Sequence, residues 1–315
     1  SSLADSLADA TGLVEVMMGA LFLGGCTSLP GITTSVTTAY QGYAELAISN
    51  AIGGIAAQTV FLAVADMAYR KINLEYAAAS IANLMHGALL ISLLAISLLA
   101  FTVPQIRFFH IHPASVLLIV AYIFGLRLIS STRTEPMWKP HYTKETRVDE
   151  VKVIRVSTLG LAMLWLPFVL LAAVVGFAGF LVAQSAIAIT GKTGLSESLV
   201  GGIFTAITTS LPELVTSIAA VRQGALTLAV GGIIGGNCFD VLFLAFADFA
   251  YRDGSIYAAA GAEPLFMIAL SLLLTGILLL GLLRREKHGI GNIGFESFLI
   301  LSIYVAAFVL LFLRG

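Results

Sequence analysis

Long apolar runs, each separated from the next by a few polar residues, dominate the chain from end to end. A helix that crosses the hydrocarbon core of a bilayer needs about 20 predominantly apolar residues. Nine runs approach or exceed that length and predict spans over residues 13–39, 44–68, 76–102, 112–130, 157–190, 196–221, 226–250, 257–283 and 294–313. The predicted fold class is therefore an all-α polytopic membrane protein.

Four of these runs contain residues that can interrupt a helix. Pro30 and Pro212 lack the N–H that would bond the carbonyl four residues earlier, and the pairs Gly53–Gly54 and Gly235–Gly236 lie inside two other runs. Irregular backbone at membrane depth is tolerated where it faces protein or a water-filled cavity. The pattern therefore predicts discontinuous helices that line a site near the midplane of the membrane.

The chain is a duplication. When the sequence is moved against itself by 182 positions, residues 11–70 align with 193–252 without a gap, and 27 of the 60 aligned positions are identical. The one long polar segment, residues 131–156, lies between the copies. The predicted organisation is a first repeat half over 1–130, a connecting loop over 131–156 and a second repeat half over 157–315.

The two halves are predicted to have opposite orientations in the membrane. The connecting loop is rich in Lys and Arg, so the positive-inside rule places it in the cytoplasm. Counting spans from there puts the Gln41–Gly42 hairpin outside and its counterpart, Gln223–Gly224, inside. Inverted repeats with discontinuous helices are typical of secondary transporters. A symmetric protein would have about five helices in each repeat, so the first helix of the first repeat is expected to be missing from this chain.

Composition supports a membrane location and argues against other classes of protein. Hydrophobic residues make up 58% of the chain and charged residues 11%, against about 45–50% and about 25% in soluble domains. The formal net charge is −1 and no basic run is present, which argues against a nucleic-acid partner. We expect the protein to be surrounded by the lipid bilayer, as a multi-pass integral protein of the plasma (inner) membrane of a prokaryote. Cys26 and Cys238 offer neither a disulfide framework nor a zinc-finger spacing.

The chemistry of the second repeat is concentrated on two neighbouring helices. Four oxygen-bearing side chains follow the spacing i, i+4, i+7 and i+8 and share one helix face: Thr209, Glu213, Thr216 and Ser217. Asn237 and Asp240 follow the second glycine pair at i, i+3 spacing. A carboxylate inside a span is costly and marks an ion or proton path by default. An all-oxygen set suits a hard cation such as Ca²⁺ or Na⁺, although serine and threonine hydroxyls often bond only to their own helix.

At these residues the sequence resembles the cation/calcium exchanger (CaCA) superfamily. Its repeats carry Gly-Thr-Ser-x-Pro-Glu on one helix and Gly-Asn-x-x-Gly-Ser-Asn-x-x-(Asn/Asp) on the next, and the corresponding segments here are Thr208–Glu213 and Gly231–Asp240. The resemblance implies a ten-helix fold whose repeat helices line a central cation site, and antiport of Ca²⁺ against Na⁺ or H⁺. The Asn-x-x-Asp ending is more similar to the sodium/calcium branch than to the proton/calcium branch.

Carried over residue by residue, the resemblance implies a set of metal ligands: Glu213, Asp240, Thr209, Ser210, Thr27, Ser28 and Gln58, with Asn237 and Asn50 as weaker members. The first repeat departs from the family's pattern. Gly31 stands where the family has its acidic residue, and Gln58 stands at the position equivalent to Asp240. Ile55 likewise replaces the counterpart of Asn237. Only the second repeat keeps the acidic pair.

Three other polar residues in apolar runs are interpreted as structural. Asp66 is followed by Met-Ala-Tyr-Arg and Asp248 by Phe-Ala-Tyr-Arg, in both cases at the end of a run. We expect the two aspartates to cap a helix or to pair with Arg70 and Arg252. His86 stands alone in its run and is expected to be a satisfied core residue.

These observations predict a secondary active antiporter that exchanges Ca²⁺ for Na⁺ by alternating access, with no enzymatic activity and no cofactor beyond the transported ions. Two alternatives stay open. One is an exchanger that is coupled to H⁺ or carries another divalent cation such as Mn²⁺ or Mg²⁺, because Gly31 and Gln58 change the charge of the ligand set. The other is a non-transporting membrane scaffold or cation sensor with a degenerate site. An intramembrane aspartyl hydrolase is disfavoured, because the chain lacks a Gly-x-Gly-Asp motif.

Overall fold

In the computed structural model, the described residues are 25, 27–69, 72–103, 110–132, 158–287 and 294–314. The regular elements in these ranges are helices: α3 (Leu29–Tyr40), α4 (Ala44–Ala68), α5 (Leu74–Ala78), α6 (Ile81–Thr102), α7 (Pro113–Thr132), α8 (Thr158–Thr193), α9 (Glu197–Leu199), the π-helix η1 (Val200–Thr205), α10 (Ala206–Thr209), α11 (Leu211–Arg222), α12 (Leu226–Asp240), α13 (Leu242–Ala250), α14 (Ile256–Ala259), α15 (Glu263–Arg284) and α16 (Phe295–Arg314). The predicted connecting loop, apart from its first two residues at the end of α7, lies outside the described residues.

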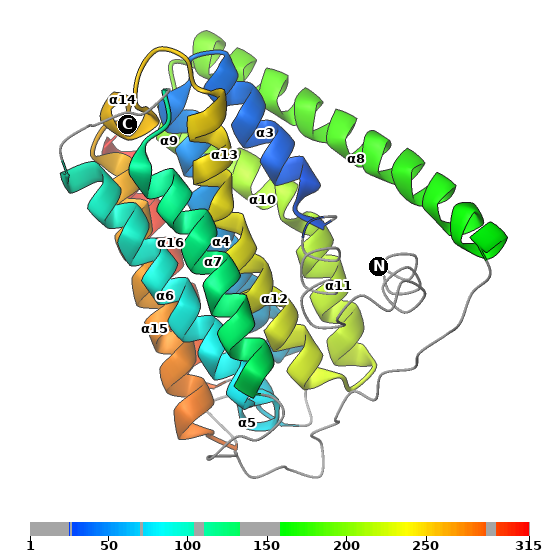
Figure 1. The fold of residues 1–315 in the computed structure, drawn as a ribbon. Helices are drawn as coiled ribbons and strands as arrows, with labels where there is room; N and C mark the ends of the chain where they lie inside the picture. Colours follow the sequence, from blue (N-terminus) through cyan, green and yellow to red (C-terminus); the bar gives the residue numbers. More distant parts are fainter. Residues whose placement is uncertain are drawn as a thin grey trace.

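The helices repeat at the same interval as the sequence. Helices α3 and α11, α6 and α15, and α7 and α16 begin and end 182 residues apart, and α4 corresponds in the same register to α12 followed by α13. The duplication therefore extends well beyond the segment in which sequence identity is visible. The hairpin after α3 and the hairpin after α11 lie at opposite ends of the molecule (Figure 1), so the two halves are inverted. Gly42 and Gly224 provide the positive φ angles, 89° and 75°, that these hairpins require.

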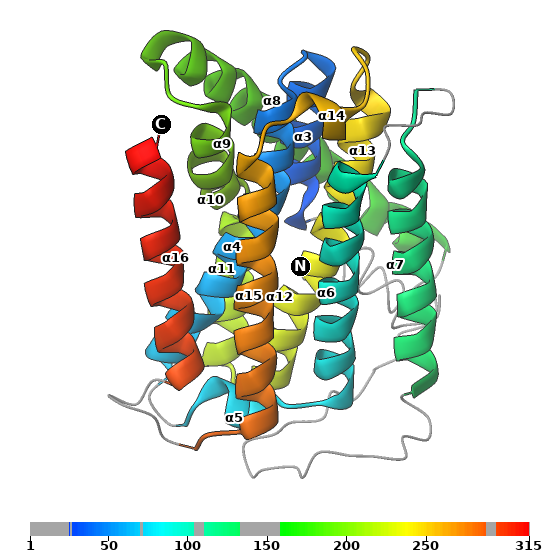
Figure 2. The ribbon, with the colours of Figure 1, turned by 90° about the vertical axis from the view of Figure 1, so that its left-hand side faces the viewer.

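Helix α4 and the α12–α13 pair form the centre of the bundle. In the most apolar stretch of each helix, 94% of the residues of α4 and 72% of those of α12–α13 are buried inside the bundle, against 11% of those of α8. Helices α3, η1, α15 and α16 pack on α4, while α6 packs on α12 and α15. Figure 2 shows α15 and α6 in front of this centre, with α16 and α7 on the flanks. Helix α8 runs diagonally along one side of the bundle and packs mainly on α3 (Figure 1).

The outer helices present apolar side chains to their surroundings. Leu170 and Phe177 on α8, and Phe298 and Leu310 on α16, are each more than half exposed. Seven described helices are long and apolar enough to cross a membrane, and the bent segment from α9 to α11 makes eight. Extended apolar surfaces of this kind mark contact with lipid or with partner proteins. The remaining predicted span, 13–39, is the first in the chain and lies partly outside the described residues. Helix α3 covers its second part.

The prolines mark helix breaks, as predicted. Helix α10 ends at Thr209, Ser210 leaves the helix with φ −95° and ψ 2°, and α11 starts with Pro212 in its first turn. The two parts of this span are bent by 44°. Pro30 lies in the first turn of α3 in the same way. A proline suits the first turn because the N–H groups there have no partner within the helix.

The glycine pairs do not interrupt their helices, so that part of the sequence prediction is wrong. Helix α4 continues through Gly53–Gly54, and α12 continues through Gly235–Gly236. Glycine keeps its backbone N–H, so the helical hydrogen bonds continue, and only the side chain is lost. A Cβ atom at Gly53 would lie 2.6 Å from Cα of Gly202 in η1. The glycine therefore allows the central helix of the first repeat to touch the π-helix of the second.

Two predicted spans are each divided into a short and a long helix. Residues 76–102 fall on α5 and α6, and residues 257–283 fall on α14 and α15. Ser80, in extended conformation, separates the first pair and caps α6 by accepting a hydrogen bond from the N–H of Asn83 (3.1 Å).

Gly53→Ala should lower the thermal stability of the protein, because the added methyl group must push the backbone of Gly202 away. Overpacking a tight contact costs about 1–3 kcal/mol. Gly232→Ala in α12 is the matched control, since nothing lies within 4 Å of its Cβ position. We expect the unfolding midpoint of the detergent-purified protein, followed by circular dichroism, to fall for Gly53→Ala and to stay unchanged for Gly232→Ala. Equal midpoints would contradict the close contact between α4 and η1.

Candidate functional site

Interrupted helices meet beside α4 in the interior of the bundle. Ser28 precedes α3, Ser210 separates α10 from α11, and Asp240 is the last residue of α12. Glu213 lies in the first turn of α11, where the unpaired N–H groups and the helix dipole favour a negative charge. Gln58 comes from the continuous helix α4.

A serine hydroxyl lies between the two carboxylates of this region. Oγ of Ser28 donates to Oδ1 of Asp240 over 2.6 Å, and Oε1 of Glu213 lies 3.5 Å from the same Oγ. The neighbouring Thr27 side chain is also a hydrogen-bond partner of Glu213. The start of α3 in the first repeat is thereby joined to both acidic residues of the second.

Gln58 contacts its own counterpart in the second repeat. Its Nε2 donates to Oδ2 of Asp240 over 2.6 Å and lies 3.3 Å from Oγ of Ser210. Gln58 and Asp240 are separated by 182 residues, the repeat interval. The approximate symmetry axis that relates the repeats therefore passes close to this amide–carboxylate hydrogen bond.

Six of the nine predicted ligands thus come together, and we call them the central oxygen cluster: Thr27, Ser28, Gln58, Ser210, Glu213 and Asp240. Both carboxylates are at most 5% exposed, and within the described residues neither forms an ion pair. Oε2 of Glu213 and Oε1 of Gln58 are buried and have no hydrogen-bond partner in the part of the chain that the structure describes. Buried charges need compensation, so this cluster can hold a hard cation or a proton.

The other three predicted ligands lie beside the cluster and bond elsewhere. Thr209 donates to a carbonyl of its own helix over 2.9 Å, with Oδ1 of Asn50 at 3.4 Å. Nδ2 of Asn50 donates to the hydroxyl of Ser35 (2.8 Å). Nδ2 of Asn237 donates to the hydroxyl of Thr59 (3.2 Å). These bonds join α4 to α3, α10 and α12, and a ligand role for the three residues stays a prediction.

Phe243 occupies the space into which a first-repeat carboxylate would project. Gly31 is the counterpart of Glu213, and a Cβ atom at Gly31 would lie 2.7 Å from Cε2 of Phe243. The Phe243 ring is buried and packs edge-to-face on Phe239, with centroids 6.2 Å apart. Sequence reasoning missed this residue because Phe61 is its identical counterpart, so the repeat comparison shows no difference there.

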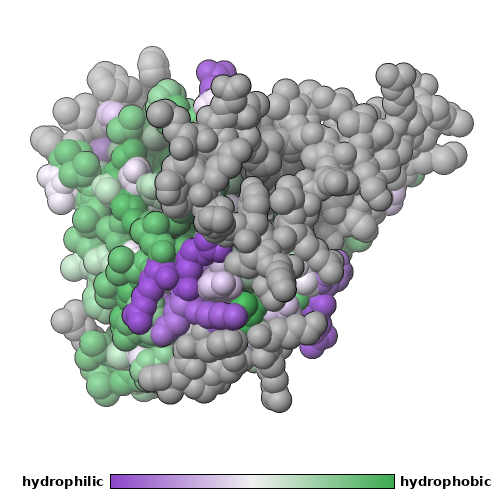
Figure 3. Space-filling model, turned by 90° about the horizontal axis from the view of Figure 1, so that it is seen from below, coloured by the Kyte–Doolittle hydropathy of each residue, from purple (hydrophilic) through white to green (hydrophobic). Residues whose placement is uncertain are grey.

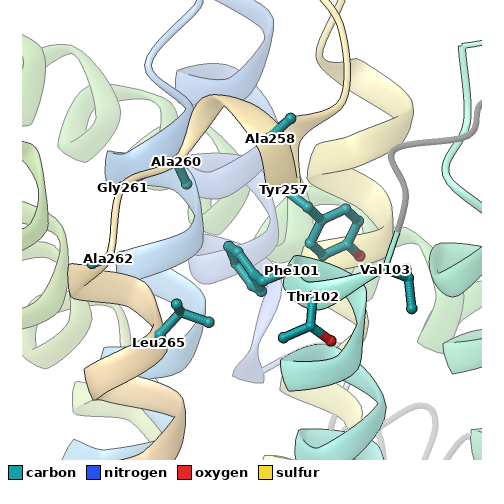
Figure 4. Close-up of a pocket in the computed structure, with 9 residues that line it drawn as sticks. All are labelled: Phe101, Thr102, Val103, Tyr257, Ala258, Ala260, Gly261, Ala262 and Leu265. Atoms are coloured by element: carbon teal, nitrogen blue, oxygen red, sulfur yellow. The ribbon is translucent and has the colours of Figure 1, made fainter.

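A pocket of about 540 Å³ lies between the end of α6 and the segment that joins α14 to α15 (Figure 4). Thr102 and Tyr257 are the residues of its lining that carry polar side-chain groups, and Phe101 and Leu265 belong to its apolar part. No carboxylate lines this pocket. Its chemistry therefore differs from that of the central oxygen cluster, and it is not the candidate cation site.

The cluster also differs from a site built entirely from strong metal ligands. Among the described residues, no group of three or more His, Cys, Asp or Glu side chains is arranged to hold a metal ion. The central oxygen cluster has two carboxylates, and its other oxygens belong to hydroxyl groups and an amide. Such a mixture suits a hard, weakly held cation better than a permanently bound transition metal.

Comparison with known proteins gives a family match in both halves of the chain. The family model described as sodium/calcium exchanger protein matches residues 1–130 and 163–313. The protein named "Putative antiporter CaxA" of Alkalimonas amylolytica is 28% identical over 298 residues, which are 94% of this chain and 89% of that protein. The sodium/calcium exchanger MaX1 of Methanosarcina acetivorans is 31% identical over 125 residues, 38% of this chain and 32% of that protein.

Solved structures share the fold. The sodium-calcium exchanger NCX_Mj has a TM-score of 0.58 at 20% identity, covering 98% of this chain and 91% of that one. The H⁺/Ca²⁺ exchanger CAX has a TM-score of 0.61 at 15% identity, covering 99% of this chain and 77% of that one. These similarities confirm the predicted all-α architecture of two inverted repeats. The chain is an integral, multi-pass membrane protein that belongs to the sodium/calcium exchanger protein family, whose members are cation antiporters.

Proposed function

We propose that this protein exchanges Ca²⁺ for Na⁺ across a membrane and that the central oxygen cluster binds both ions in turn. The proposal depends on one observation above all: Glu213 and Asp240 are buried beside the same Ser28 hydroxyl, and no described residue provides a cationic partner for either. Two adjacent carboxylates in an apolar bundle repel each other and lose their hydration. A cation bound between them would compensate both costs.

The neutral oxygens around the carboxylates favour Na⁺ over H⁺ as the counter-ion. A proton needs one carboxylate oxygen, whereas a hard metal cation needs several oxygen ligands. The hydroxyls of Ser28 and Ser210 lie within hydrogen-bonding distance of the acidic pair or of Gln58. Half a turn of the Gln58 amide would bring its unpartnered Oε1 to the position from which Nε2 now contacts Asp240. The cluster would then offer four neutral oxygens beside two carboxylates, namely the hydroxyls of Thr27, Ser28 and Ser210 and the amide oxygen of Gln58.

Coupling to H⁺ is the second candidate, and the same serine supports it. Both carboxylates approach the single hydroxyl of Ser28, which can donate only one hydrogen bond. Without a bound metal ion, one carboxylate of such a pair tends to take up a proton. The similar solved structures include both a sodium-calcium exchanger and an H⁺/Ca²⁺ exchanger, so they do not decide between the two counter-ions.

The position of the cluster suits alternating access. It lies between the interrupted helices of two inverted repeats, the geometry in which movement of one repeat against the other can expose a site to either side. We further propose that the membrane is the plasma (inner) membrane of a prokaryote. An inner membrane protein of Escherichia coli (strain K12), YrbG, is 37% identical over 99 residues, 31% of this chain and 30% of that protein, which supports this location.

Radioactive Ca²⁺ uptake into proteoliposomes tests the proposal directly. An imposed outward Na⁺ gradient should drive Ca²⁺ uptake, because Na⁺ leaving the vesicle is exchanged for Ca²⁺ entering it. A pH gradient of equal driving force, imposed at constant Na⁺, should drive little uptake. Uptake driven by the pH gradient alone would establish the H⁺-coupled alternative, and uptake driven by neither gradient would favour a scaffold or sensor.

Glu213→Gln and Asp240→Asn should each abolish exchange while leaving the fold intact, because each removes a ligand charge at almost constant volume. An opposite charge at about 4 Å contributes about 4 kcal/mol at an effective dielectric constant of about 20, which is roughly 1000-fold in affinity. The measurements are Ca²⁺ titration calorimetry and flux. Asp253→Asn, at an exposed carboxylate in a turn, is the control and should behave like the wild type. Normal flux in either cluster variant would place the site elsewhere.

Gly31→Glu should tighten Ca²⁺ binding only when Phe243 is made smaller. In the otherwise unchanged protein, the new side chain would collide with the ring atoms Cε2 and Cζ of Phe243, which would lie 2.7 and 3.4 Å from its Cβ. Combined with Phe243→Leu, which removes those atoms, the glutamate can face the cluster and adds a third carboxylate. Calorimetry should show a higher affinity for the double variant than for Phe243→Leu alone. Equal affinities in folded proteins would mean that Gly31 does not face the ion.

A further inference from the structure

Asp66, at the end of α4, fastens two neighbouring segments to that helix. Its Oδ1 accepts a hydrogen bond from the N–H of Leu74 (2.8 Å), at the start of α5. Its Oδ2 accepts from the N–H of Gly294 (3.2 Å) and from the hydroxyl of Ser297 (3.1 Å), where α16 begins. Asp66 forms no ion pair within the described residues. Asp66 therefore fixes the segments at the starts of α5 and α16 to the end of α4. Arg70, its predicted partner, lies outside the described residues.

Asp248, its counterpart in the second repeat, accepts equivalent hydrogen bonds at the other end of the bundle. Its Oδ2 accepts from the N–H of His112 (2.8 Å) and from the hydroxyl of Ser115 (2.7 Å), where α7 begins. Oγ of Ser115 lies 3.0 Å from the Tyr257 hydroxyl. Asp248 forms no ion pair with Arg252, so the predicted pairing is not formed, and Asp248 instead bonds the segment that starts α7, in line with the alternative expectation of a cap. Among the described residues, Oδ1 of Asp248 and Nε2 of His112 are buried without a hydrogen-bond partner.

The Asp66 end differs from the Asp248 end by two additional carboxyl groups. Glu75 stands at the position equivalent to Tyr257, and Glu296 at the position equivalent to Ala114. Glu75 is 1% exposed and Glu296 is fully buried. Helix α5, which carries Glu75, lies at the lower end of the bundle in Figures 1 and 2. Figure 3 views this end, where a band of hydrophilic residues lies beside a hydrophobic flank.

The carboxyl groups of Glu75 and Glu296 accept fewer hydrogen bonds than their buried oxygens require. Oε1 of Glu296 accepts from Nδ2 of Asn73 over 2.9 Å. Among the described residues, Oε2 of Glu296 and both carboxyl oxygens of Glu75 have no hydrogen-bond donor. Leu74 and Ser297, the chain neighbours of Glu75 and Glu296, both bond to the Asp66 carboxylate, which brings the Glu75 and Glu296 side chains near enough to hydrogen-bond to each other. Two ionised carboxylates cannot do so, because neither has a hydrogen to donate.

Among the described residues, no Lys or Arg forms an ion pair with Glu75. Arg285, directly after α15, donates to the backbone carbonyl of Tyr76 (3.2 and 3.1 Å), and Arg284, the last residue of α15, pairs with Glu286 at 3.6 Å. Helix α12, which packs on α5, carries no charged residue except Asp240 at its far end. Asp66 on α4 and Glu296 on α16 are both negative. Burial, followed by these two negative charges, raises the pKa of Glu75 well above its ordinary value of 4.5.

We propose that Glu75 and Glu296 form a proton-binding site, separate from the central oxygen cluster, in which one shared proton fastens α5 to α16. A proton on Glu75 makes it a donor to Oε2 of Glu296 and so satisfies two of the three unpartnered oxygens. Asp66 accepts hydrogen bonds at both oxygens already and stays ionised. A metal ion is a poorer occupant, since the described residues contain no group of three acidic side chains in metal-binding geometry.

The proton has a structural consequence for the core of the protein. When Glu75 loses it, three negative charges lie together in a buried space, and the resulting repulsion loosens the contact between α5, α16 and the end of α4. Helix α4 carries Gln58 of the central oxygen cluster. The site therefore connects the pH at this end of the molecule to the helix that reaches the candidate cation site.

The pH dependence of thermal stability tests the proposal without any transport assay. A folded-state pKa above the ordinary value means that the stabilisation is fully present below about pH 4.5 and is lost as the pH rises through the folded-state value. The unfolding midpoint of the wild type in detergent should therefore fall by a few degrees as the pH rises through that window. Glu75→Gln, which keeps one donor at all pH values, should make this decline smaller, and so should Glu296→Gln, while the part that comes from Glu213 and Asp240 should remain. Asp253→Asn should retain it.

Infrared spectroscopy supplies a second readout. In the Glu213→Gln/Asp240→Asn background, which removes the carboxyl groups of the central cluster, a band of a protonated carboxyl group should be present at neutral pH and absent after the further change Glu75→Gln. The proposal is overturned if that band is unaffected or if Glu75→Gln leaves the pH dependence unchanged. It is also overturned if the unfolding midpoint changes with the Na⁺ or Ca²⁺ concentration and this change disappears in Glu75→Gln. The site at Glu75 and Glu296 would then bind a metal cation.

Discussion

The burial of Glu213 and Asp240 inside an apolar helix bundle is the constraint on which the rest of the structure depends. A carboxylate at this depth must find donors or cations within the protein, because water and headgroups are distant. The chain provides donors by interrupting helices: Ser28, at a helix break, donates to Asp240, and Glu213 lies in a first turn with unpaired N–H groups. Close helix packing then brings Gln58 of α4 to Asp240. The proline breaks and the small residues thus serve one purpose, which is to bring oxygen and N–H groups to two negative charges.

The backbone of the protein is symmetric, whereas its charge is not. Helix boundaries repeat at an interval of 182 residues with almost no deviation, so the two halves provide equivalent positions at each point. Glu213 in one half corresponds to Gly31 in the other, where the ring of Phe243 fills the space. Asp240 corresponds to Gln58, and the neutral Tyr257 corresponds to the buried Glu75. Packing fixes the frame because a helix that shifts loses many contacts, but a single buried side chain can change when a neighbour replaces its volume or its hydrogen bonds.

The sequence was most informative where a residue affects the backbone directly. A proline removes an N–H, so the helix breaks at Pro30 and Pro212 followed from the residue type alone. The repetition of those breaks, with serine or threonine beside each, predicted the residues that the structure brings together. The glycine pairs were misread, because a missing side chain can mean either a break or a close contact, and only the neighbouring Gly202 decides the matter. Glu75 and Glu296 were not recognised as a pair, since they are 221 residues apart and each resembles an ordinary charge near a helix end.

Under the proposed assignment, the loss of the first-repeat carboxylate limits the charge that the central oxygen cluster can balance. Glu213 and Asp240 together carry at most two negative charges, which one Ca²⁺ or two Na⁺ neutralise. A third Na⁺ would leave a positive charge in a region from which water is excluded, and such a charge is costly. The aromatic ring at the Gly31 position also removes space that a third ion and its ligands would need. Under this assignment we expect one divalent ion to be exchanged for two monovalent ions, so that each turnover moves no net charge across the membrane.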